Sequence, residues 1–300
     1  MDRKEGLVVR VHGGHYYVKA DQQIIDCAIR GRLKQEQVEG DLVAIGDRVL
    51  WSPIEEGRGV IEEVLPRKSV LSRLSPEARG QIEQVIVANP DQVLIVFSVR
   101  MPPLNPFMLD RYLVACEAAN LPAAIVVNKI DLAEPADLEL VERYRKIGYY
   151  VLPTSAVTGE GLEELRQLLR GKLTVLTGPS GVGKSTLLNL LWPDLDLPVG
   201  EISTYHERGK HTTVVPWLLN PEPDVYVADT PGLRQFRFWD IEPEQLDAFF
   251  PEMLPHLNKC RFTPCTHMHE PGCAVRMAVE RGEISEQRYE SYRRMFRHEV

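Results

Sequence analysis

The chain has 300 residues, a length that suits two or three packed domains and exceeds that of a single small module. Its hydrophobic content of 44% and charged content of 26% are those of a globular protein and exclude a largely disordered chain. The net charge of −8 comes from residues 71–255, which hold 16 basic and 25 acidic residues. Both ends of the chain are therefore close to neutral, and either can meet a polyanion.

The sequence carries no sign of a membrane protein. No apolar run approaches the length that a membrane-spanning helix needs. Residues Met1–Glu5 lead into an alternating pattern and not into the apolar core of a signal peptide. We therefore expect a cytoplasmic protein that does not act at a membrane.

Residues 1–68 have the pattern of a small β-barrel. Short alternating or β-branched runs, separated by glycine and charged turns, predict strands at Leu7–Val11, Tyr16–Ala20, Gln23–Arg30, Leu42–Leu50 (broken at Gly46) and Gly59–Val64. Five strands in about sixty residues indicate a barrel of the oligonucleotide-binding (OB-fold) or SH3-like kind. The polar stretch from Pro66 to Arg79 resembles a linker.

In residues 69–240, predicted strands alternate with predicted helices. This pattern indicates the central domain of a multidomain α/β protein. The strands are expected at Asp91–Ser98, Ala123–Val127, Tyr149–Leu152 and Leu173–Thr177, and the helices at Asn105–Asn120, Asp137–Tyr144 and Gly161–Leu169. Such alternation indicates a parallel sheet covered on both faces. Residues 241–300 have a mostly helical pattern, interrupted by a cluster of cysteine and histidine.

A complete phosphate-loop motif follows the predicted strand Leu173–Thr177 and opens a helix at Ser185–Leu191. Its glycines let backbone N–H groups approach the phosphates of a nucleotide, and the helix N-terminus adds positive potential. Lys184 is expected to reach the β- and γ-phosphates and so to act in catalysis, and Ser185 to ligate Mg²⁺. The residues assigned to GTP here are Gly178, Pro179, Ser180, Gly181, Val182, Gly183, Lys184, Ser185 and Thr186.

A second phosphate-site motif, Asp229-Thr-Pro-Gly232, ends the apolar strand predicted at Val225–Ala228. The Asp229 carboxylate is expected to hold Mg²⁺ through a water molecule, and the Gly232 amide to face the γ-phosphate. An Asp-x-x-Gly spacing also occurs in ordinary turns. The presence of a phosphate loop in the same chain makes its assignment to the phosphate site specific.

The sequence Asn128-Lys129-Ile130-Asp131 is the guanine-specificity signature of G proteins. The Asp131 carboxylate can accept hydrogen bonds from N1–H and the exocyclic amine of guanine, a donor pair that adenine lacks. Missing hydrogen bonds at a buried acceptor cost about 1–3 kcal/mol each, so the wrong base is rejected. Ser155 and Ala156 follow the next predicted strand and match a further G-protein motif, whose backbone N–H groups meet the base oxygen.

The order of these motifs indicates a circular permutation. Ordinary G proteins begin with the phosphate loop, whereas here residues 128–131 and 155–156 precede it and Asp229 follows it. The same sheet can form if the original termini are joined and the chain is opened elsewhere, because termini usually lie close together. The join must be the short Arg170-Gly171-Lys172 segment.

The run Arg208-Gly-Lys-His-Thr-Thr213 lies where a switch threonine is expected. Thr213 is our first candidate to ligate Mg²⁺ and act in catalysis, and Thr212 is the alternate. The pair can also simply begin a β-strand. Leu233 stands where many G proteins place a water-orienting glutamine, and leucine cannot orient water. His211 is the nearest catalytic candidate, although a loop histidine is often only a surface residue.

Three of the five cysteines crowd into Cys260-x4-Cys265-x-His267-x5-Cys273. Three thiolates and an imidazole form a closed tetrahedral set, which is the ligand composition of one structural Zn²⁺ site. His269 and His256 compete with His267. Cys27 and Cys116 have apolar surroundings and are expected to pack in cores.

Two further groups of residues have open interpretations. The first group is a set of arginines on the helical sequence near the C-terminus, which form either a solvated face or a face that contacts phosphates. They are Arg276, Arg281, Arg288, Arg293, Arg294 and Arg297. The second is Tyr16, Tyr17 and Trp51 of the barrel, which can stack on bases or pack in the barrel core.

With these motifs in view, the whole chain resembles the RsgA (YjeQ) family of bacterial small-ribosomal-subunit biogenesis GTPases. The resemblance rests on the barrel, the permuted motif order with Gly-Lys-His-Thr-Thr, and the Cys-x4-Cys-x-His-x5-Cys segment. It implies a cytoplasmic, monomeric factor that binds the 30S subunit through 16S rRNA late in assembly. It also implies that subunit contact stimulates hydrolysis of GTP to GDP and phosphate.

The resemblance also implies a hydrophobic residue in place of the usual glutamine, which Leu233 satisfies. One departure is Val214, where relatives often carry a third threonine. Two other functions stay open: a GTP-regulated RNA-binding scaffold, and a permuted GTPase acting on another ribonucleoprotein.

Overall fold

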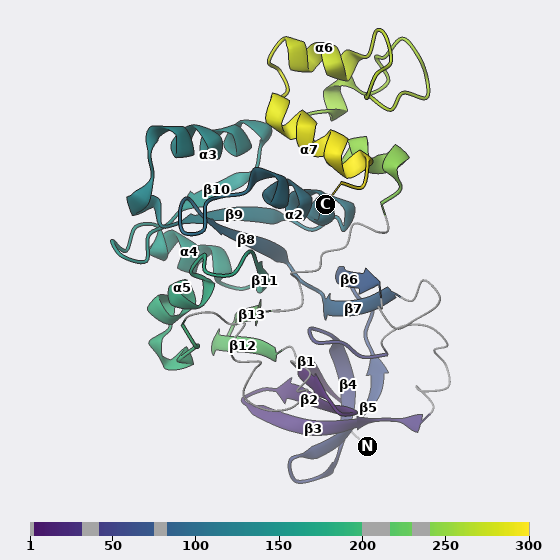
Figure 1. The fold of residues 1–300 in the computed structure, drawn as a ribbon. Coiled ribbons are helices and arrows are strands. Elements are labelled where there is room, and N and C mark those ends of the chain that lie inside the picture. Colours follow the sequence, from purple (N-terminus) through teal and green to yellow (C-terminus); the bar gives the residue numbers. More distant parts are fainter. Residues whose placement is uncertain (1–2, 32–41, 75–82, 200–216, 230–240, 300) are drawn as a thin grey trace.

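The computed structural model describes residues 3–31, 42–74, 83–199, 217–229 and 241–299. It has three parts along one axis: an N-terminal β-barrel, a central α/β sheet, and a helical C-terminal segment (Figure 1). This confirms the fold class predicted from the sequence. Within the described residues, no helix combines the length and the apolar character that a membrane span requires.

The barrel consists of five strands: β1 (Lys4–His12), β2 (His15–Ala20), β3 (Gln23–Ile29), β4 (Arg48–Glu55) and β5 (Arg58–Val64). They pair in the order β1-β2-β3-β5-β4, and β1 also pairs with β4, which closes the barrel. Alternate side chains point inward and form its core, among them Val8, Val18 and Ile61. Trp51 is 4% exposed and belongs to this core, so it is a packing residue.

The strand predicted at Leu42–Leu50 is wrong in its position, because β4 begins at Arg48. A turn precedes it. The Asp47 carboxylate is buried, accepts the N–H of Ala44 at 2.7 Å, and accepts two hydrogen bonds from Arg67 at 2.8 Å each. Gly46, at φ +85°, completes the turn. The apolar residues before Asp47 have the sequence pattern of a strand. They form a turn instead, which the ion pair between Asp47 and the distant Arg67 stabilises.

The predicted linker also contains a strand. Within Pro66–Arg79, β6 (Val70–Leu74) pairs antiparallel with β7 (Glu83–Ala88). Leu71 and Val87 are buried on this small sheet and join the core of the α/β domain. A strand of five residues with polar neighbours shows little periodicity in the sequence. The two-stranded β6–β7 sheet can therefore be recognised only from the pairing of both strands.

The central domain is a six-stranded sheet in the order β10-β9-β8-β11-β13-β12. All neighbouring pairs are parallel except β12, which runs antiparallel to β13. The strands are β8 (Gln92–Ser98), β9 (Ala123–Asn128), β10 (Tyr150–Pro153), β11 (Leu173–Thr177), β12 (Trp217–Glu222) and β13 (Val225–Asp229). The helices are α2 (Pro106–Ala118), α3 (Pro135–Ile147), α4 (Leu162–Leu169) and α5 (Lys184–Leu191), with short 3-10 turns at Ile130–Leu132 and Pro193–Leu195.

Helices cover both faces of this sheet, which explains why every residue of β8 is buried. Val93, Ile95 and Phe97 pack with α2 and α3, whereas Leu94 and Val96 pack with α4 and α5. Figure 1 shows the two helix pairs on opposite sides of the strands. The predicted doubly covered parallel sheet is therefore confirmed.

The barrel and the central sheet meet at one strand edge. β1 pairs with β12 through Arg10 and Trp217, so that both sheets form one continuous hydrogen-bonded array. The Arg10 guanidinium lies over the rings of Tyr17, at 5.3 Å, and Trp217, at 4.9 Å. Cation–π contacts of this kind are favourable and hold the barrel against the central sheet.

The C-terminal segment contains two 3-10 helices, η5 (Pro243–Phe249) and η6 (Leu254–His256), and two α-helices, α6 (Ala274–Glu280) and α7 (Glu286–Phe296). A buried ion network joins α7 to α2. The Arg288 guanidinium, 2% exposed, lies 2.8 Å from Asp110 and 2.6 Å from Glu252. Removing one partner from such a network typically costs about 3–5 kcal/mol. Arg288 therefore belongs to neither of the two surfaces that we considered for the C-terminal arginines.

Candidate nucleotide and metal sites

The predicted nucleotide motifs converge on one edge of the central sheet. Asn128 ends β9, Ser155 follows β10, Gly178 follows β11, and Asp229 ends β13. These are the carboxyl ends of parallel strands, where open α/β sheets bind their ligands. Asp229 is in register with Leu176 of the adjacent β11, which places its backbone beside the phosphate loop. Gly232 lies outside the described residues.

The phosphate loop has the backbone geometry that its glycines permit. Gly178 adopts φ +135°, and a Cβ there would lie 2.0 Å from the carbonyl oxygen of Val96. Lys184 begins α5, and its ammonium group donates to the carbonyls of Gly178 at 2.8 Å and Pro179 at 2.7 Å. The positive charge thus lies in the mouth of the loop, where phosphate oxygens would bind. Val182 is buried in the core, so only its backbone faces this site.

The guanine motif is hydrogen-bonded directly to the phosphate loop. The buried Asn128 side chain donates to the carbonyl of Val182 at 2.8 Å, and Lys129 donates to the carbonyl of Gly181 at 2.8 Å. Gly183 adopts φ +98° beneath this contact, and a Cβ there would come within 2.3 Å of the Asn128 amide nitrogen. The two halves of the site, 54 residues apart between Asn128 and Val182, therefore form one unit.

The Asp131 carboxylate, predicted to recognise the base, is oriented by Ser155. The Ser155 hydroxyl donates to Asp131 at 2.5 Å, and it accepts the N–H groups of Val157 at 3.2 Å and Thr158 at 3.1 Å. Ser155 is buried, whereas Asp131 is exposed at the site. The side chain of Ser155 thus holds this loop together, and its backbone N–H donates to the carbonyl of Glu160 at 3.0 Å, so its predicted backbone contact with the base stays a prediction.

The switch residues predicted from the sequence lie outside the described residues. They are His211, Thr212, Thr213 and Leu233. Their assignments stay predictions. Ser185, in the first turn of α5, and Thr186 beside it are described and lie next to Lys184 at the loop.

The four predicted metal ligands come together in the C-terminal segment. One ligand atom from each of Cys260, Cys265, His267 and Cys273 lies within 4.8 Å of the others, so this set could hold a metal ion. His267 Nδ1 lies 3.3 Å from Cys273 Sγ and 3.5 Å from Cys260 Sγ. The competing His269 is exposed and lies outside the cluster.

One supporting residue escaped the sequence analysis. The Asp247 carboxylate on η5 lies 3.1 Å from His267 Nε2 and so fixes the tautomer that turns Nδ1 toward the thiols. Asp247 is twenty residues before His267, and no spacing rule connects the two. A histidine at a metal site is commonly paired with a carboxylate, but the sequence does not indicate which carboxylate pairs with His267.

The loop that carries the ligands is held by hydrogen bonds. The Glu270 carboxylate accepts the N–H groups of Thr266, Met268 and His269. Burial opposes its ionisation, but these bonds and one from the Thr266 hydroxyl lower the pKa of Glu270 to about 2. The hydroxyl of Tyr289, on α7, donates to the carbonyl of His267 at 2.6 Å. The ligand cluster is therefore preformed by its protein surroundings.

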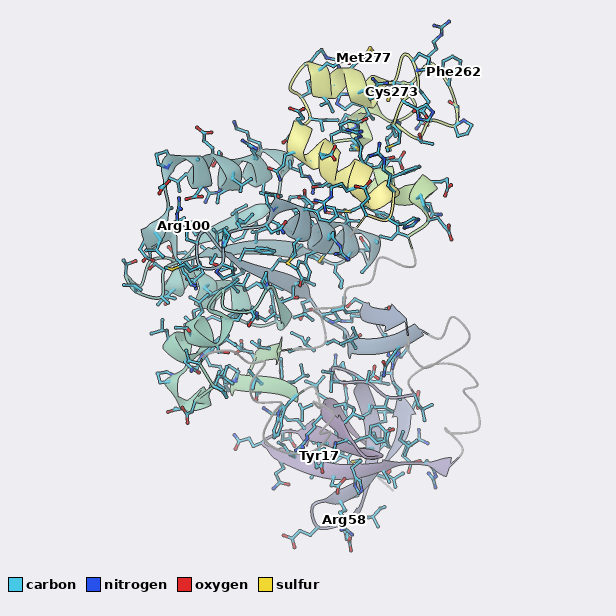
Figure 2. The ribbon with its side chains drawn as sticks, in the orientation of Figure 1. Tyr17, Arg58, Arg100, Phe262, Cys273 and Met277 are labelled. Atoms are coloured by element: carbon cyan, nitrogen blue, oxygen red, sulfur yellow. The ribbon has the colours of Figure 1, made fainter. Side chains whose placement is uncertain are left out.

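The remaining two cysteines are packing residues, as predicted. Cys27 lies in the barrel core and Cys116 in α2, and neither is more than 1% exposed. The metal cluster lies at the far end of the molecule from the barrel, as the positions of Cys273 and Tyr17 show (Figure 2). The nucleotide site lies between the two.

These features define a class: a circularly permuted phosphate-loop GTPase domain between an OB-type barrel and a metal-ligand segment. Comparison with known families agrees. The RsgA N-terminal domain model matches residues 5–61, and the RsgA GTPase model matches residues 64–239. The chain belongs to the RsgA family and is a GTPase.

Relatives match over nearly the whole chain. Proteins named small ribosomal subunit biogenesis GTPase RsgA are 43% identical in Moorella thermoacetica and 45% identical in Gemmatimonas aurantiaca, each over 96% of this chain and 94% of the relative. The crystal structure of YjeQ from Thermotoga maritima is 37% identical, with a TM-score of 0.80 over 99% of both chains. YloQ, described as a circularly permuted GTPase, is 31% identical, with a TM-score of 0.76 over 99% of this chain and 95% of its own.

Proposed function

We propose that this protein is a ribosome-stimulated GTPase that binds the 30S subunit through 16S rRNA and acts late in its maturation, hydrolysing GTP to GDP and phosphate. The observation that carries the proposal is the Asn128–Val182 hydrogen bond, which unites a guanine motif and a phosphate loop in permuted order. The names of the relatives at 43–45% identity supply the particle on which it acts. A monomeric, cytoplasmic protein is part of the same proposal.

The division of labour in the nucleotide site follows from the chemistry of each group. Asn128, Lys129, Asp131, Ser155 and Ala156 bind the base, and residues 178–186 with Asp229 and Gly232 bind the phosphates. Lys184 opposes the charge that develops on the β- and γ-phosphates. Ser185, Thr213 and Asp229 would hold Mg²⁺, which neutralises phosphate charge when bound. Leu233 leaves water unoriented, so His211 or a group of the subunit orients it.

The Cys260, Cys265, His267 and Cys273 set is assigned to one structural Zn²⁺. Three thiolates and one imidazole suit zinc and leave no open position for catalysis. We also propose domain limits of 1–68, 69–240 and 241–300, which the matched ranges of the two family models approximate. The outer domains, which are less acidic than the middle, then make most of the RNA contacts.

Leu233 also favours the alternative of a GTP-regulated RNA-binding scaffold, since such a protein needs no hydrolysis. Both functions require selective binding, which co-sedimentation measures. Purified protein with a non-hydrolysable GTP analogue should pellet with 30S subunits and not with 50S subunits, and GDP should weaken the association. Equal pelleting with 50S subunits would favour another ribonucleoprotein as the target.

A further inference from the structure

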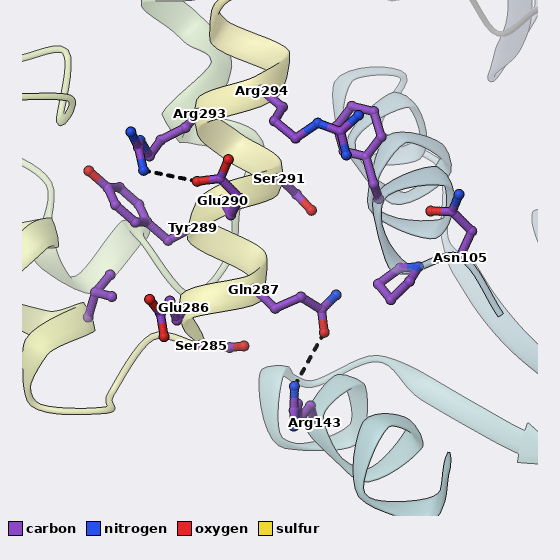
Figure 3. A pocket seen from close by; sticks show the side chains of 13 residues that line it. Asn105, Arg143, Ser285, Glu286, Gln287, Tyr289, Glu290, Ser291, Arg293 and Arg294 are labelled. Carbon is purple, nitrogen blue, oxygen red and sulfur yellow. Dashed lines mark hydrogen bonds and ion pairs between the residues drawn. The ribbon is translucent and has the colours of Figure 1, made fainter. Parts of the chain in front are cut away.

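A cleft of about 980 Å³ lies between α7 of the C-terminal segment and the helices α2 and α3 of the GTPase domain (Figure 3). Its inner wall is built from Phe107 and Asn105 at the start of α2, Arg143 of α3, and Gln287, Ser291 and Arg294 of α7. This cleft is separate from the nucleotide site at the strand ends. No motif of the GTPase explains it.

Arg294 differs from the other arginines of its helix. Arg288 is paired with Asp110 and Glu252, and Arg293 lies 2.9 Å from Glu290. Within the described residues, Arg294 forms no ion pair. Its guanidinium lies 3.7 Å from the centroid of the Phe107 ring. A guanidinium stacked on a ring keeps its N–H edge available for a planar or tetrahedral anion.

Arg143 brings a second charge to the same wall. It lies 3.3 Å from the amide oxygen of Gln287, and among the described parts of the chain it has no carboxylate partner. Its neighbour on α3, Arg145, is paired with Glu142 at 3.2 Å. Of the three arginines that line the cleft, Arg293 is paired with Glu290, whereas Arg143 and Arg294 have no acidic partner among the described residues.

Arg111 adds to the positive charge near this wall. Its guanidinium lies 5.9 Å from the centroid of the same Phe107 ring that Arg294 covers. Burial and the nearby charge of Arg294 lower the pKa of Arg111. Repulsion between two such groups is relieved when an anion binds beside them.

The acidic residues of α7 lie on a neighbouring stripe. Gln287, Ser291 and Arg294 are spaced i, i+4 and i+7 and point toward α2, whereas Glu286 and Glu290 line the cleft from a neighbouring side of the helix (Figure 3). Glu290 is already paired with Arg293. Glu286 and Glu290 also line the cleft, so its described lining combines three arginines with two glutamates and keeps a net positive charge around the side-chain amides.

We propose that this cleft binds the phosphate backbone of an RNA strand, with Arg294 and Arg143 each contacting a phosphate. The inference rests on the proposed function. The cleft is large enough for a nucleotide unit, and Asn105 and Gln287 bring side-chain amides suited to ribose hydroxyls. A strand bound here bridges the GTPase domain and the metal-ligand segment.

The test is the binding of purified 30S subunits by full-length protein with a GTP analogue, measured at several salt concentrations. Arg294→Ala and Arg143→Ala should each weaken binding about tenfold and reduce the slope of log K against log salt by roughly 1. Arg297→Ala is the matched control, because that arginine lies one turn further on and pairs with Glu299. GTP affinity should be unchanged in all three variants, and the thermal midpoint should fall by at most about a few degrees, in Arg294→Ala, which loses its contact with Phe107.

The outcomes separate the two claims. If the unaltered protein does not bind 30S subunits, the proposed function fails. If it binds and both variants retain its affinity and salt slope, the cleft inference is overturned. A photocrosslinker at Gln287 identifies the occupant without removing an arginine. Crosslinks to 16S rRNA support the inference, and crosslinks to ribosomal proteins alone overturn it.

Discussion

Asn128 is the residue at which the two halves of the nucleotide site meet. Its amide group donates to the phosphate loop, and the Thr154 hydroxyl donates to its side-chain oxygen at 3.4 Å. A buried amide with partners on both its nitrogen and its oxygen is held in one orientation, because flipping it would place donor against donor and acceptor against acceptor. We therefore expect the base and the phosphates of one nucleotide to be bound by a single rigid unit.

Asp131 should decide which base is accepted. In Asp131→Asn, an amide replaces one carboxylate oxygen and meets the N1–H or amine of guanine as a second donor. We expect GTP affinity to fall about 10- to 200-fold. Xanthine carries a carbonyl where guanine carries its amine, so affinity for xanthosine triphosphate should rise. Titration of both nucleotides measures this, and an unchanged preference for GTP would remove Asp131 from base recognition.

Gly183 tests whether the loop and the guanine motif are coupled. Gly183→Ala places a methyl group against the Asn128 amide at a positive φ, so we expect GTP and GDP affinities to fall at least about tenfold. Gly171→Ala is the matched control: its φ is +68°, and a Cβ there meets nothing within 4 Å. Both variants should lose some stability. Only Gly183→Ala should lose nucleotide affinity, and equal affinities in the two would contradict the coupling.

At the scale of elements, sequence periodicity correctly predicts the strands and helices whose formation depends on local sequence. The strand Leu173–Thr177 is predicted with the bounds that the structure has, and the strand Val225–Ala228 is predicted to within one residue of β13. Their patterns are uninterrupted and their ends carry clear signals. The start of β4 and the β6–β7 ribbon were missed, because Arg67 and a partner strand determine them from a distance.

The metal-ligand segment makes a testable element. Full-length protein should contain about one zinc per chain by mass spectrometry of metals, and His267→Ala should lose most of it because a ligand and its Asp247 contact disappear. His269→Ala is the control, since that side chain is exposed two residues away. Chelation should lower the thermal midpoint of the protein but not of His267→Ala. Stoichiometric zinc in His267→Ala would refute the assignment.

At the scale of the whole molecule, sequence motifs predicted the site better than they predicted its connections. Asn128, Lys184 and the Cys/His cluster were identified because their chemistry requires fixed residue types at fixed spacing. The contacts between domains were not predictable. Arg10 against Trp217 and Arg288 against Asp110 join residues about 180 positions or more apart, and single ion pairs or stacked rings leave no periodic signal.

The central domain, which carries the nucleotide site, lies between two flanking domains that each pack against it. The barrel meets the GTPase sheet at β12, and α7 meets it at α2 (Figure 1). A partner that engages both outer domains at once would span the nucleotide site. We propose that such a partner completes a catalytic site in which Leu233 takes the place of a water-orienting glutamine.

The central claim is that the small ribosomal subunit stimulates this GTPase. Its most direct test is multiple-turnover phosphate release from GTP with and without purified 30S subunits, with 50S subunits and ATP as controls. The account predicts slow release by the protein alone and strong stimulation by 30S subunits with GTP only. Equal release with 30S and 50S subunits, or none above the basal rate despite GTP binding, would contradict it.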